Sequence, residues 1–425
     1  MEDTMADETT VAPVSGTILV VGGGISGITT ALEAAEVGYE VFIVEKTPSL
    51  GGRVAQLNKY FPKLCPPTCG LEINFQRIKK NNKIKWFTLT EVEKISGGPG
   101  NYDVALKQNP RYVNNNCTCC GKCAEACDVE IPNVFNFGMD KRKAAYLPHE
   151  MSFPQRYVLD PSIIGTKTAQ KCREACPYDA IDLDDKAKTF TIKVASIVWA
   201  TGWNPYDATK MDNLSFGKVQ NVITNMMMER LAAPNGPTHG KIVRPSDGKV
   251  VNSIAFVQCA GSRDENHLTF CSYICCMASL KQTTYIREAN PESRATIYYI
   301  DLRTPGRYEK FYNKVKADGN VSFVKGKVAK IEEDPATKDV IVTAEDTLSG
   351  KKIHGRFDMV VLATGMEPST AREKVPGNAK YDENNFVVPG EILATGCVKK
   401  PSDVMLSGET ATAAALKAIQ MLVRR

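Results

Sequence analysis

A glycine-rich segment at residues 22–27, GGGISG, constrains the fold of this chain more than any other stretch. The apolar, β-branched run Thr17–Val21 precedes it, the helix-like run Ile28–Val37 follows it, and Glu40–Val44 has the composition of a second strand. A strand, a glycine-rich turn, a helix and a second strand in this order are typical of the βαβ unit that binds dinucleotides. The sequence therefore predicts a Rossmann-type fold at the start of the chain.

Four residues of this unit have predictable roles. Gly22 permits the tight turn, Gly24 lets the backbone approach a pyrophosphate, and Gly27 lets the helix pack closely on the strand. Glu45, at the end of the second strand, can accept a hydrogen bond from the adenosine ribose 2′-hydroxyl. An acid rather than an arginine at this position argues against a phosphorylated ribose, and so against NADP.

Further glycine turns favour FAD as the dinucleotide. Gly51-Gly52-Arg53 resembles the second phosphate and ribityl contact of flavoproteins with two dinucleotide domains, and so do the Ala-Thr-Gly turns at 200–202 and 363–365. A Thr-Gly turn at 395–396 lies on the segment predicted to return to the flavin. The predicted contacts outside the first unit are Gly52, Arg53, Thr201, Gly202, Gly365 and Gly396. No catalytic acid or base stands out.

The fourteen cysteines fall into tight groups, which favours metal or redox chemistry over disulfides. The first group has the spacing Cys-x2-Cys-x2-Cys-x3-Cys between Cys117 and Cys127, as in bacterial ferredoxins. Cys119 lies outside this pattern and has no predicted role. Zinc is the alternative, although zinc sites more often use two Cys-x2-Cys pairs.

Half of a second ferredoxin run follows. Its four positions hold Thr166, Ala169, Cys172 and Cys176, and Pro177 comes next. In two-cluster ferredoxins the fourth cysteine of each run binds the other cluster. This crossed arrangement predicts one surviving cluster, on Cys117, Cys120, Cys123 and Cys176. A local arrangement with Cys127 in place of Cys176 stays open.

The second half of the chain lacks a dinucleotide fingerprint. The strand-like run Ser253–Val257 is followed by cysteines rather than by GxGxxG. Soft thiolates suit an iron–sulfur cluster, and buried structural cysteines are the alternative. Neighbouring cysteines cannot share one helix face, so a helix must start or break at residues 275–276. The predicted ligands are Cys259, Cys271, Cys275 and Cys276.

The pattern predicts an α/β fold with two Rossmann-like dinucleotide-binding domains and a ferredoxin-like iron–sulfur insertion. The predicted parts are a disordered acidic tail at 1–15, an FAD-binding domain at 16–110, 187–250 and 366–425, the insertion at 111–186, and a second dinucleotide-like domain at 251–365.

Charge and composition limit the partners and the location that we expect for the protein. The net charge of +5 over 425 residues is too small to indicate nucleic acid or an anionic membrane as partner. Neither an export signal nor a run of eighteen apolar residues is present, so we expect a cytoplasmic protein that reaches a membrane only through partners. Cys65 and Cys69 form either a redox pair near the flavin or a structural pair.

Long motifs resemble the flavin subunit of heterodisulfide reductase, HdrA. They are FVQCAGSRD at 256–264 followed by CSYICC at 271–276, NVITNM at 221–226 and GKIVRPSDGK at 240–249. The resemblance runs from Thr17 to the C-terminus. It implies that the second cysteine group holds the unusual non-ferredoxin cluster of that family, and that FAD contacts Gly22, Gly24, Gly27, Glu45, Gly52 and Arg53.

The chain departs from that family by losing half of the second ferredoxin run and by ending after the flavin-domain helix. This short form is similar to the QmoA flavoproteins of quinone-interacting membrane-bound oxidoreductase complexes. The resemblance implies three partners: a second HdrA-like flavoprotein, a membrane haem b subunit, and adenylylsulfate reductase as acceptor.

We therefore predict an electron-transfer subunit in which FAD connects two-electron and one-electron chemistry. One alternative is a stand-alone NAD(P)H-dependent oxidoreductase, which the missing second fingerprint disfavours. The other is a non-catalytic assembly subunit, to which the lost ligand positions 166 and 169 give some weight.

Overall fold

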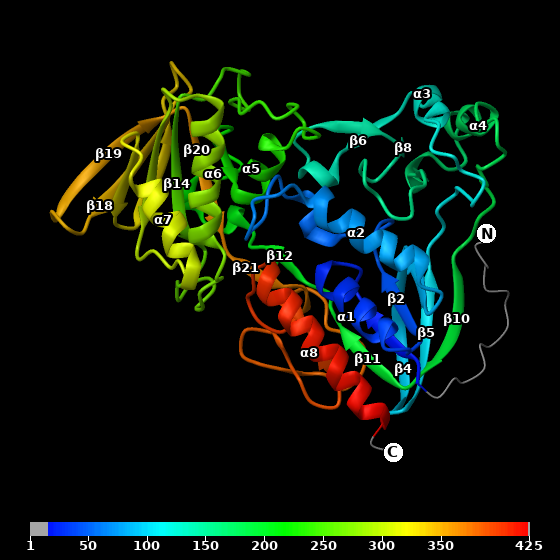
Figure 1. The fold of residues 1–425 in the computed structure, drawn as a ribbon. Coiled ribbons are helices and arrows are strands. Elements are labelled where there is room, and N and C mark those ends of the chain that lie inside the picture. The colour runs from blue at the N-terminus through cyan, green and yellow to red at the C-terminus, as the bar shows by residue number, and fades with distance from the viewer. Residues whose placement is uncertain (1–15, 424–425) are drawn as a thin grey trace. The chain divides into compact units, whose positions relative to one another are not determined.

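The computed structural model describes residues 16–423, and the acidic tail predicted at 1–15 lies outside the described residues. The chain forms two compact units (Figure 1). Unit 1 extends to residue 202 and takes in residues 368–400 and the C-terminal segment from residue 404. Unit 2 comprises residues 203–367 and 401–403.

Unit 1 is built on a five-stranded parallel sheet with the order β24-β11-β1-β2-β3. Every residue of β1 and β2 is buried, which explains why these strands are continuous apolar runs rather than alternating ones. The strands are β1 (Ile18–Val21), β2 (Val41–Glu45), β3 (Ile84–Thr88), β11 (Ser196–Trp199) and β24 (Leu393–Ala394).

Helices and a second sheet complete unit 1. Helix α1 (Ile25–Glu36) packs against α8 (Val404–Val423), and both share a core with the sheet and α2 (Pro67–Lys80). Other side chains of the sheet share a separate core with an antiparallel sheet of β4 (Thr90–Gly98), β5 (Asn101–Gln108) and β10 (Lys188–Val194). The parallel sheet is therefore covered by apolar side chains of the helices and of the antiparallel sheet.

The insertion forms a small body with its own core inside unit 1. It carries two short helices, α3 (Lys122–Ala126) and α4 (Lys167–Glu174), which pack together. Its strands are short: β6 (Glu130–Pro132), β7 (Lys141–Lys143), β8 (Ala145–Tyr146) and β9 (Val158–Leu159). Cys123, Cys127 and Cys172 are buried in this core.

Unit 2 repeats the parallel-sheet architecture with the order β13-β20-β14-β15-β16. An antiparallel three-stranded sheet of β17, β18 and β19 shares its core. Its helices are α5 (Asn225–Ala232), α6 (Cys275–Ala289) and α7 (Glu309–Lys316). Its strands are β12 (Trp203–Pro205), β13 (Val222–Thr224), β14 (Ser253–Ala260), β15 (Arg294–Tyr299), β16 (Val321–Lys325), β17 (Val328–Glu333), β18 (Val340–Asp346), β19 (Lys351–Phe357) and β20 (Met359–Thr364).

Three details differ from the sequence-based expectations. Residues 203–250 group with unit 2 rather than with the FAD-binding domain, because β13 pairs in parallel with β20. The strand-like composition of Thr189–Trp199 indicates one strand, but the run forms two, β10 and β11, which join different sheets. The Ala-rich run Glu409–Val423 indicates a closing helix, and helix α8 begins more than a turn earlier, at Val404. The remaining strands are β21 (Met366–Pro368), β22 (Lys380–Tyr381) and β23 (Val387–Val388).

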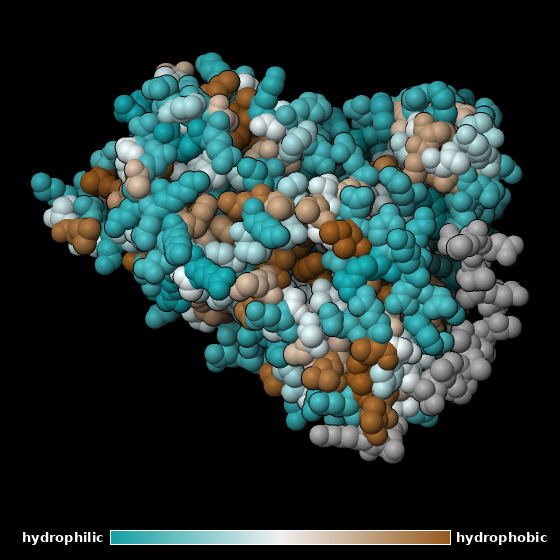
Figure 2. Space-filling model, viewed as in Figure 1, coloured by the Kyte–Doolittle hydropathy of each residue, from teal (hydrophilic) through white to brown (hydrophobic). Residues whose placement is uncertain are grey.

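Within residues 16–423, no helix is both long and apolar enough to cross a membrane. Figure 2 shows that the drawn face is largely polar, with hydrophobic side chains gathered over α8. Met405, Leu416 and Val423 are the exposed large apolar side chains of that helix.

Candidate functional site

The glycine loop joins β1 to α1 and leaves open space at only one of its glycines. Gly22 has φ +115°, and a Cβ there would lie 2.3 Å from the carbonyl oxygen of Ala200. A Cβ on Gly27 would lie 1.8 Å from the carbonyl oxygen of Gly22. A Cβ on Gly24 would meet only Gly52 Cα, at 3.8 Å. Gly22 and Gly27 are therefore required by the backbone itself, whereas Gly24 keeps room for a ligand.

The N-terminus of α1 faces that open space with its backbone amides. Gly24 is the N-cap residue of α1, and no side chain caps the helix. The first N–H groups of a helix lack intrahelical acceptors, and together with the helix dipole they favour an anion. A pyrophosphate fits this position.

Glu45 ends β2 beside the loop with both carboxylate oxygens engaged. Its Oε2 accepts a hydrogen bond from the Gly23 amide at 2.6 Å, and its Oε1 accepts from the amide and hydroxyl of Thr47, each at 2.8 Å. Burial raises the pKa of Glu45 above its ordinary value, and the hydrogen bonds from Thr47 and Gly23 oppose that rise. An ionised carboxylate has about four acceptor sites, so it retains capacity for a ribose hydroxyl.

The second glycine pair approaches the first from the segment that follows β2. Gly52 has φ +56°, and a Cβ there would lie 2.8 Å from Gly24 Cα. The amide of Gly51 donates to the carbonyl oxygen of Gly23 at 2.8 Å. Arg53 follows, and its pKa is lowered to about 10 by burial and then by Arg372. Two cationic side chains near each other suit an anionic ligand such as a dinucleotide phosphate.

The remaining predicted contacts of unit 1 join the same end of the sheet. Thr201 accepts a hydrogen bond from the Ser369 hydroxyl at 2.7 Å, and the carbonyl oxygen of Gly202 accepts from the Ser369 amide at 3.1 Å. Gly396 has φ +65°, and a Cβ there would lie 2.1 Å from Ser26 Oγ in the first turn of α1. The carboxyl ends of β1, β11 and β24 therefore converge on the glycine loop.

Gly365 belongs to unit 2 instead. A Cβ on it would lie 2.6 Å from both Leu268 Cδ1 and Ser262 Oγ, and its carbonyl oxygen accepts from the Tyr206 amide. Its contacts are thus with the region of the second cysteine group. The prediction that it contacts FAD stays a prediction.

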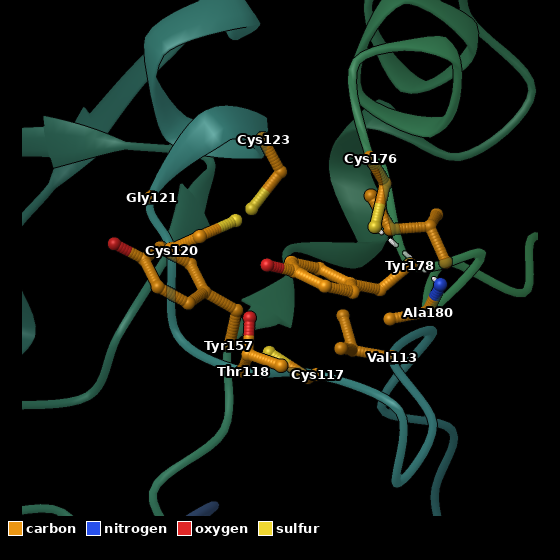
Figure 3. A pocket seen from close by; sticks show the side chains of 11 residues that line it. Val113, Cys117, Thr118, Cys120, Gly121, Cys123, Tyr157, Cys176, Tyr178 and Ala180 are labelled. Atoms are coloured by element: carbon orange, nitrogen blue, oxygen red, sulfur yellow. Dashed lines mark hydrogen bonds between the residues drawn. The ribbon is translucent and has the colours of Figure 1, made fainter.

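In the insertion, four cysteines line one pocket (Figure 3). The pocket has about 300 Å³ of space, part of it open to solvent. Figure 3 shows the ring of Tyr178 lying among the cysteine side chains. The amide of Ala180 donates to Cys176 Sγ at 3.4 Å. The four cysteines are Cys117, Cys120, Cys123 and Cys176.

Cys127 is not among the residues that line this pocket. Its thiol instead donates to the carbonyl oxygen of Val129 at 3.5 Å. Burial together with the nearby Cys127 raises the pKa of Cys172 to about 12. Cys172 Sγ in turn donates to the carbonyl oxygen of Cys123 at 3.3 Å. At the other second-run positions, Thr166 caps α4 by accepting from the amide of Ala169. The arrangement fits the crossed ligand set rather than the local one.

The second cysteine group gathers at the carboxyl end of β14. Helix α6 begins at Cys275, as the adjacent cysteines required. Burial raises the pKa of Cys275 well above its ordinary value, and the nearby thiols of Cys259, Cys276 and Cys271 add to the rise. All four predicted thiols therefore lie within electrostatic reach of one another. A bound cluster would take these groups as thiolates.

The chemistry of both groups fits iron–sulfur clusters better than zinc. Among residues 16–423, no three or more His, Cys, Asp or Glu side chains are placed to hold a single metal ion. In a cubane cluster each cysteine binds a different iron, so its ligands stand farther apart than those around one ion. Soft sulfur ligands without histidine also favour such a cluster.

Sequence reasoning missed the charged residues beside the second group. Arg263 lies near Cys259, and Arg303 lies near Cys271. Asp301 pairs with both arginines. Arg263 stands four positions after Cys259, which is the only sequence signal that could have indicated it. Cys65 is half-buried and Cys69 is exposed near the start of α2. Burial raises the pKa of Tyr60, and the nearby Cys69 and Cys65 add to this rise.

Comparisons with known proteins agree with this geometry. Residues 17–65 match the profile of a family described as FAD dependent oxidoreductase. The thioredoxin reductases of T. acidophilum and Lactococcus lactis share the fold, with 16% and 12% identity and TM-scores of 0.50 and 0.52. Each alignment covers 96% of this chain, with 97% and 100% of the respective reductase. The predicted α/β class with two dinucleotide-binding folds is confirmed.

Relatives that align with most of the chain belong to heterodisulfide reductases. A CoB–CoM heterodisulfide reductase iron–sulfur subunit (HdrA) of Methanopyrus kandleri is 39% identical over 98% of this chain and 66% of its own length. The HdrA protein of the ferredoxin/F420H2-dependent CoB–CoM heterodisulfide reductase of Methanosarcina acetivorans is 35% identical over 96% of this chain and 53% of its own. This chain thus spans between about half and two thirds of these relatives.

The family match confirms FAD and iron–sulfur clusters as the cofactor classes, and oxidoreduction as the class of chemistry. It does not test the individual ligands. The alignment with the Methanopyrus relative covers nearly the whole chain, including the glycine loop and both cysteine groups. The chain therefore belongs to the HdrA family of FAD-dependent oxidoreductase subunits.

Proposed function

We propose that this chain is an electron-transfer subunit that holds one FAD in unit 1 and an iron–sulfur cluster at each of its two cysteine groups. The single observation that carries the proposal is the pocket in which four cysteines from two distant segments meet. A cluster explains why thiols from residues 117–123 and 176 converge on one space lined by apolar side chains.

The chain's own residues would bind and orient the flavin. The α1 amides and Arg53 attract the phosphates, Glu45 accepts from the adenosine ribose, and Gly24 gives the backbone access. When bound, FAD supplies the exchange between two-electron and one-electron steps. The protein's part in setting potentials is burial and hydrogen bonding, as from the Ala180 amide to Cys176.

We further propose that the chain works in a complex that relays electrons between a membrane quinone module and adenylylsulfate reductase. The sequence resemblance to the QmoA flavoproteins supports this, as does the loss of two of the four cysteine positions of the second ferredoxin run. The partners would be a second HdrA-like flavoprotein and a membrane haem b subunit, which would hold this chain at the cytoplasmic face of the membrane.

The test uses the complex isolated by an affinity tag on this chain under anaerobic conditions. We expect the flavoprotein and haem b partners to co-purify, and we expect a reduced quinone analogue to drive electrons to adenylylsulfate reductase. Loss of this transfer after removal of the haem subunit would agree with the relay. Absence of both partners would contradict it.

The alternatives give different outcomes in the same preparation. Steady NADH oxidation with a dye acceptor would favour a stand-alone NAD(P)H-dependent oxidoreductase. A flavin that the quinone analogue cannot reduce, in a complex that assembles normally, would favour an assembly subunit.

A further inference from the structure

Two arginines and an aspartate form a charged group against the second cysteine group. Asp301 Oδ1 lies 2.5 Å from an Nη of Arg263, and Asp301 Oδ2 lies 3.3 Å from an Nη of Arg303. The backbone carbonyl oxygen of Asp301 lies 3.7 Å from Cys276 Sγ. Asp301 therefore fixes both guanidinium groups relative to the cysteines. We call Arg263, Asp301 and Arg303 the arginine bridge.

The arginine bridge brings positive charge to the cysteine group through Asp301, whose backbone contacts Cys276 and whose side chain pairs with both arginines. Arg263 lies near Cys259, and Arg303 lies near Cys271. Cys275 is the exception, since its Sγ faces the carbonyl oxygen of Thr364 at 3.8 Å.

We propose that Arg263 and Arg303 raise the reduction potential of the cluster held by Cys259, Cys271, Cys275 and Cys276, with Asp301 as the residue that positions them. This inference rests on the proposed function, because it needs a cluster at that site. Reduction adds one electron and breaks no bond. Two arginines and one aspartate leave a net positive charge beside the four thiolates, and positive charge favours the more negative, reduced state.

The two arginines differ in exposure, and this difference sets the order of their effects. The Arg263 side chain is 24% exposed, whereas that of Arg303 is 51% exposed. Water and salt screen an exposed charge more strongly than a partly buried one. Arg263 should therefore contribute more than Arg303, although each lies near one thiol of the group.

The test is an anaerobic redox titration of the full chain, followed by EPR, with iron content measured in each sample. Arg263→Gln should lower the ratio of reduced to oxidised cluster by roughly tenfold at a fixed ambient potential, which corresponds to about 59 mV for one electron. Arg303→Gln should lower the ratio less, and Arg263→Lys should restore most of the wild-type value. The signal of the cluster in the insertion serves as an internal standard and should not move.

Arg356→Gln is the matched control, because Arg356 lies in the same unit and pairs with Asp334 and Asp339 between β17 and β18. Unchanged potentials in both glutamine variants, with iron retained, would overturn the inference. If Arg263→Gln does not hold iron, Arg303→Gln, at a more exposed position, decides the question alone. A wild-type chain without a cluster at this site would instead contradict the proposed function.

Discussion

The thiol of Cys127 lies beside that of Cys172 and donates to the carbonyl oxygen of Val129, although the spacing of Cys127 from Cys123 is that of a ferredoxin ligand. Both side chains are buried, and Cys127 is not among the residues lining the pocket that Cys176 joins. In the crossed arrangement of two-cluster ferredoxins, Cys127 and Cys172 would belong to a second cluster, whose other two positions hold a helix-capping threonine and a buried alanine here. The geometry therefore favours one cluster in the insertion.

This relationship predicts opposite results for two cysteine substitutions. Cys176→Ala should remove about four irons per chain, because it takes one ligand from the cluster. Cys127→Ala should keep those irons, because Cys127 does not line the pocket and its thiol donates to the carbonyl oxygen of Val129 instead. Iron and sulfide analysis after anaerobic purification distinguishes the two variants.

Cys119→Ala is the control for both substitutions. Cys119 donates to the carbonyl oxygen of Gln155 at 3.0 Å, and burial raises its pKa to about 11, so we expect no loss of iron. Loss of iron in Cys127→Ala with retention in Cys176→Ala would establish the local ligand set instead.

Two substitutions in the glycine loop should separate an effect on flavin binding from an effect on folding. Gly24→Ala should fold and bind FAD at least tenfold more weakly, because its Cβ fills open space at the helix N-terminus. Gly27→Ala should lower the stability of the apoprotein, because its Cβ would overlap a backbone oxygen at 1.8 Å. Thermal unfolding with and without FAD measures both effects, and Gly98→Ala, with nothing within 4 Å, is the control. Equal destabilisation by both variants would count against this division.

Glu45 predicts a pH dependence of flavin binding. Burial raises its pKa above 4.5, so acidification neutralises Glu45 at a higher pH than it neutralises an exposed glutamate. The neutral carboxyl accepts hydrogen bonds more weakly, and FAD affinity should fall as the pH drops through that raised pKa. Glu45→Gln should bind FAD roughly tenfold more weakly at neutral pH and lack this dependence.

Acid unfolding through Glu45 does not account for this fall in FAD affinity at low pH. A carboxyl with a raised pKa in the folded state contributes stability at low pH and loses it as the pH rises through that pKa, so Glu45 favours the folded apoprotein on acidification. FAD titrations followed by flavin fluorescence, with circular dichroism at each pH, separate binding from folding. A pH dependence that persists in Glu45→Gln would assign it to another group.

A buried ion pair in unit 2 predicts a large loss of stability. Lys281 Nζ lies 3.1 Å from Glu229 Oε1, and both side chains are nearly inaccessible. Lys281→Met removes the cation beside the buried Glu229 carboxylate, which should cost about 3 kcal/mol of the free energy of unfolding. Lys338→Met breaks the exposed pair with Glu333 and should cost under about 1 kcal/mol. Chemical denaturation of the chain measures both, and equal losses would show that burial does not set the strength of this pair.

The sequence predicts those parts of the site that depend on local spacing. The glycine loop and Glu45 are predictable because a βαβ unit brings them together within one short segment. Cys176 can be predicted as a ligand because the fourth cysteine of each run in two-cluster ferredoxins binds the other cluster. The start of α6 at Cys275 follows from the geometry of adjacent residues on a helix.

The rest depends on contacts between distant segments, which spacing does not encode. Strand β13 has only three residues and lies in a region rich in proline and glycine, so its pairing with β20 leaves no pattern in the sequence. Arg303 lies on a loop after β15 and reaches Cys271 only because the sheet of unit 2 brings both to one edge. Residues 189–199 divide into two strands at Ala195, whose amide donates to the carbonyl oxygen of Thr17 before β1 and whose carbonyl oxygen accepts from the amide of Gly100 before β5.

The most direct test of the central claim is an iron, sulfide and flavin analysis of the anaerobically purified chain, with EPR of the reduced protein. We expect about one FAD and roughly eight irons per chain, with two distinct cluster signals. FAD without iron in protein kept from air would contradict the electron-transfer role and leave the cysteine groups as structural thiols.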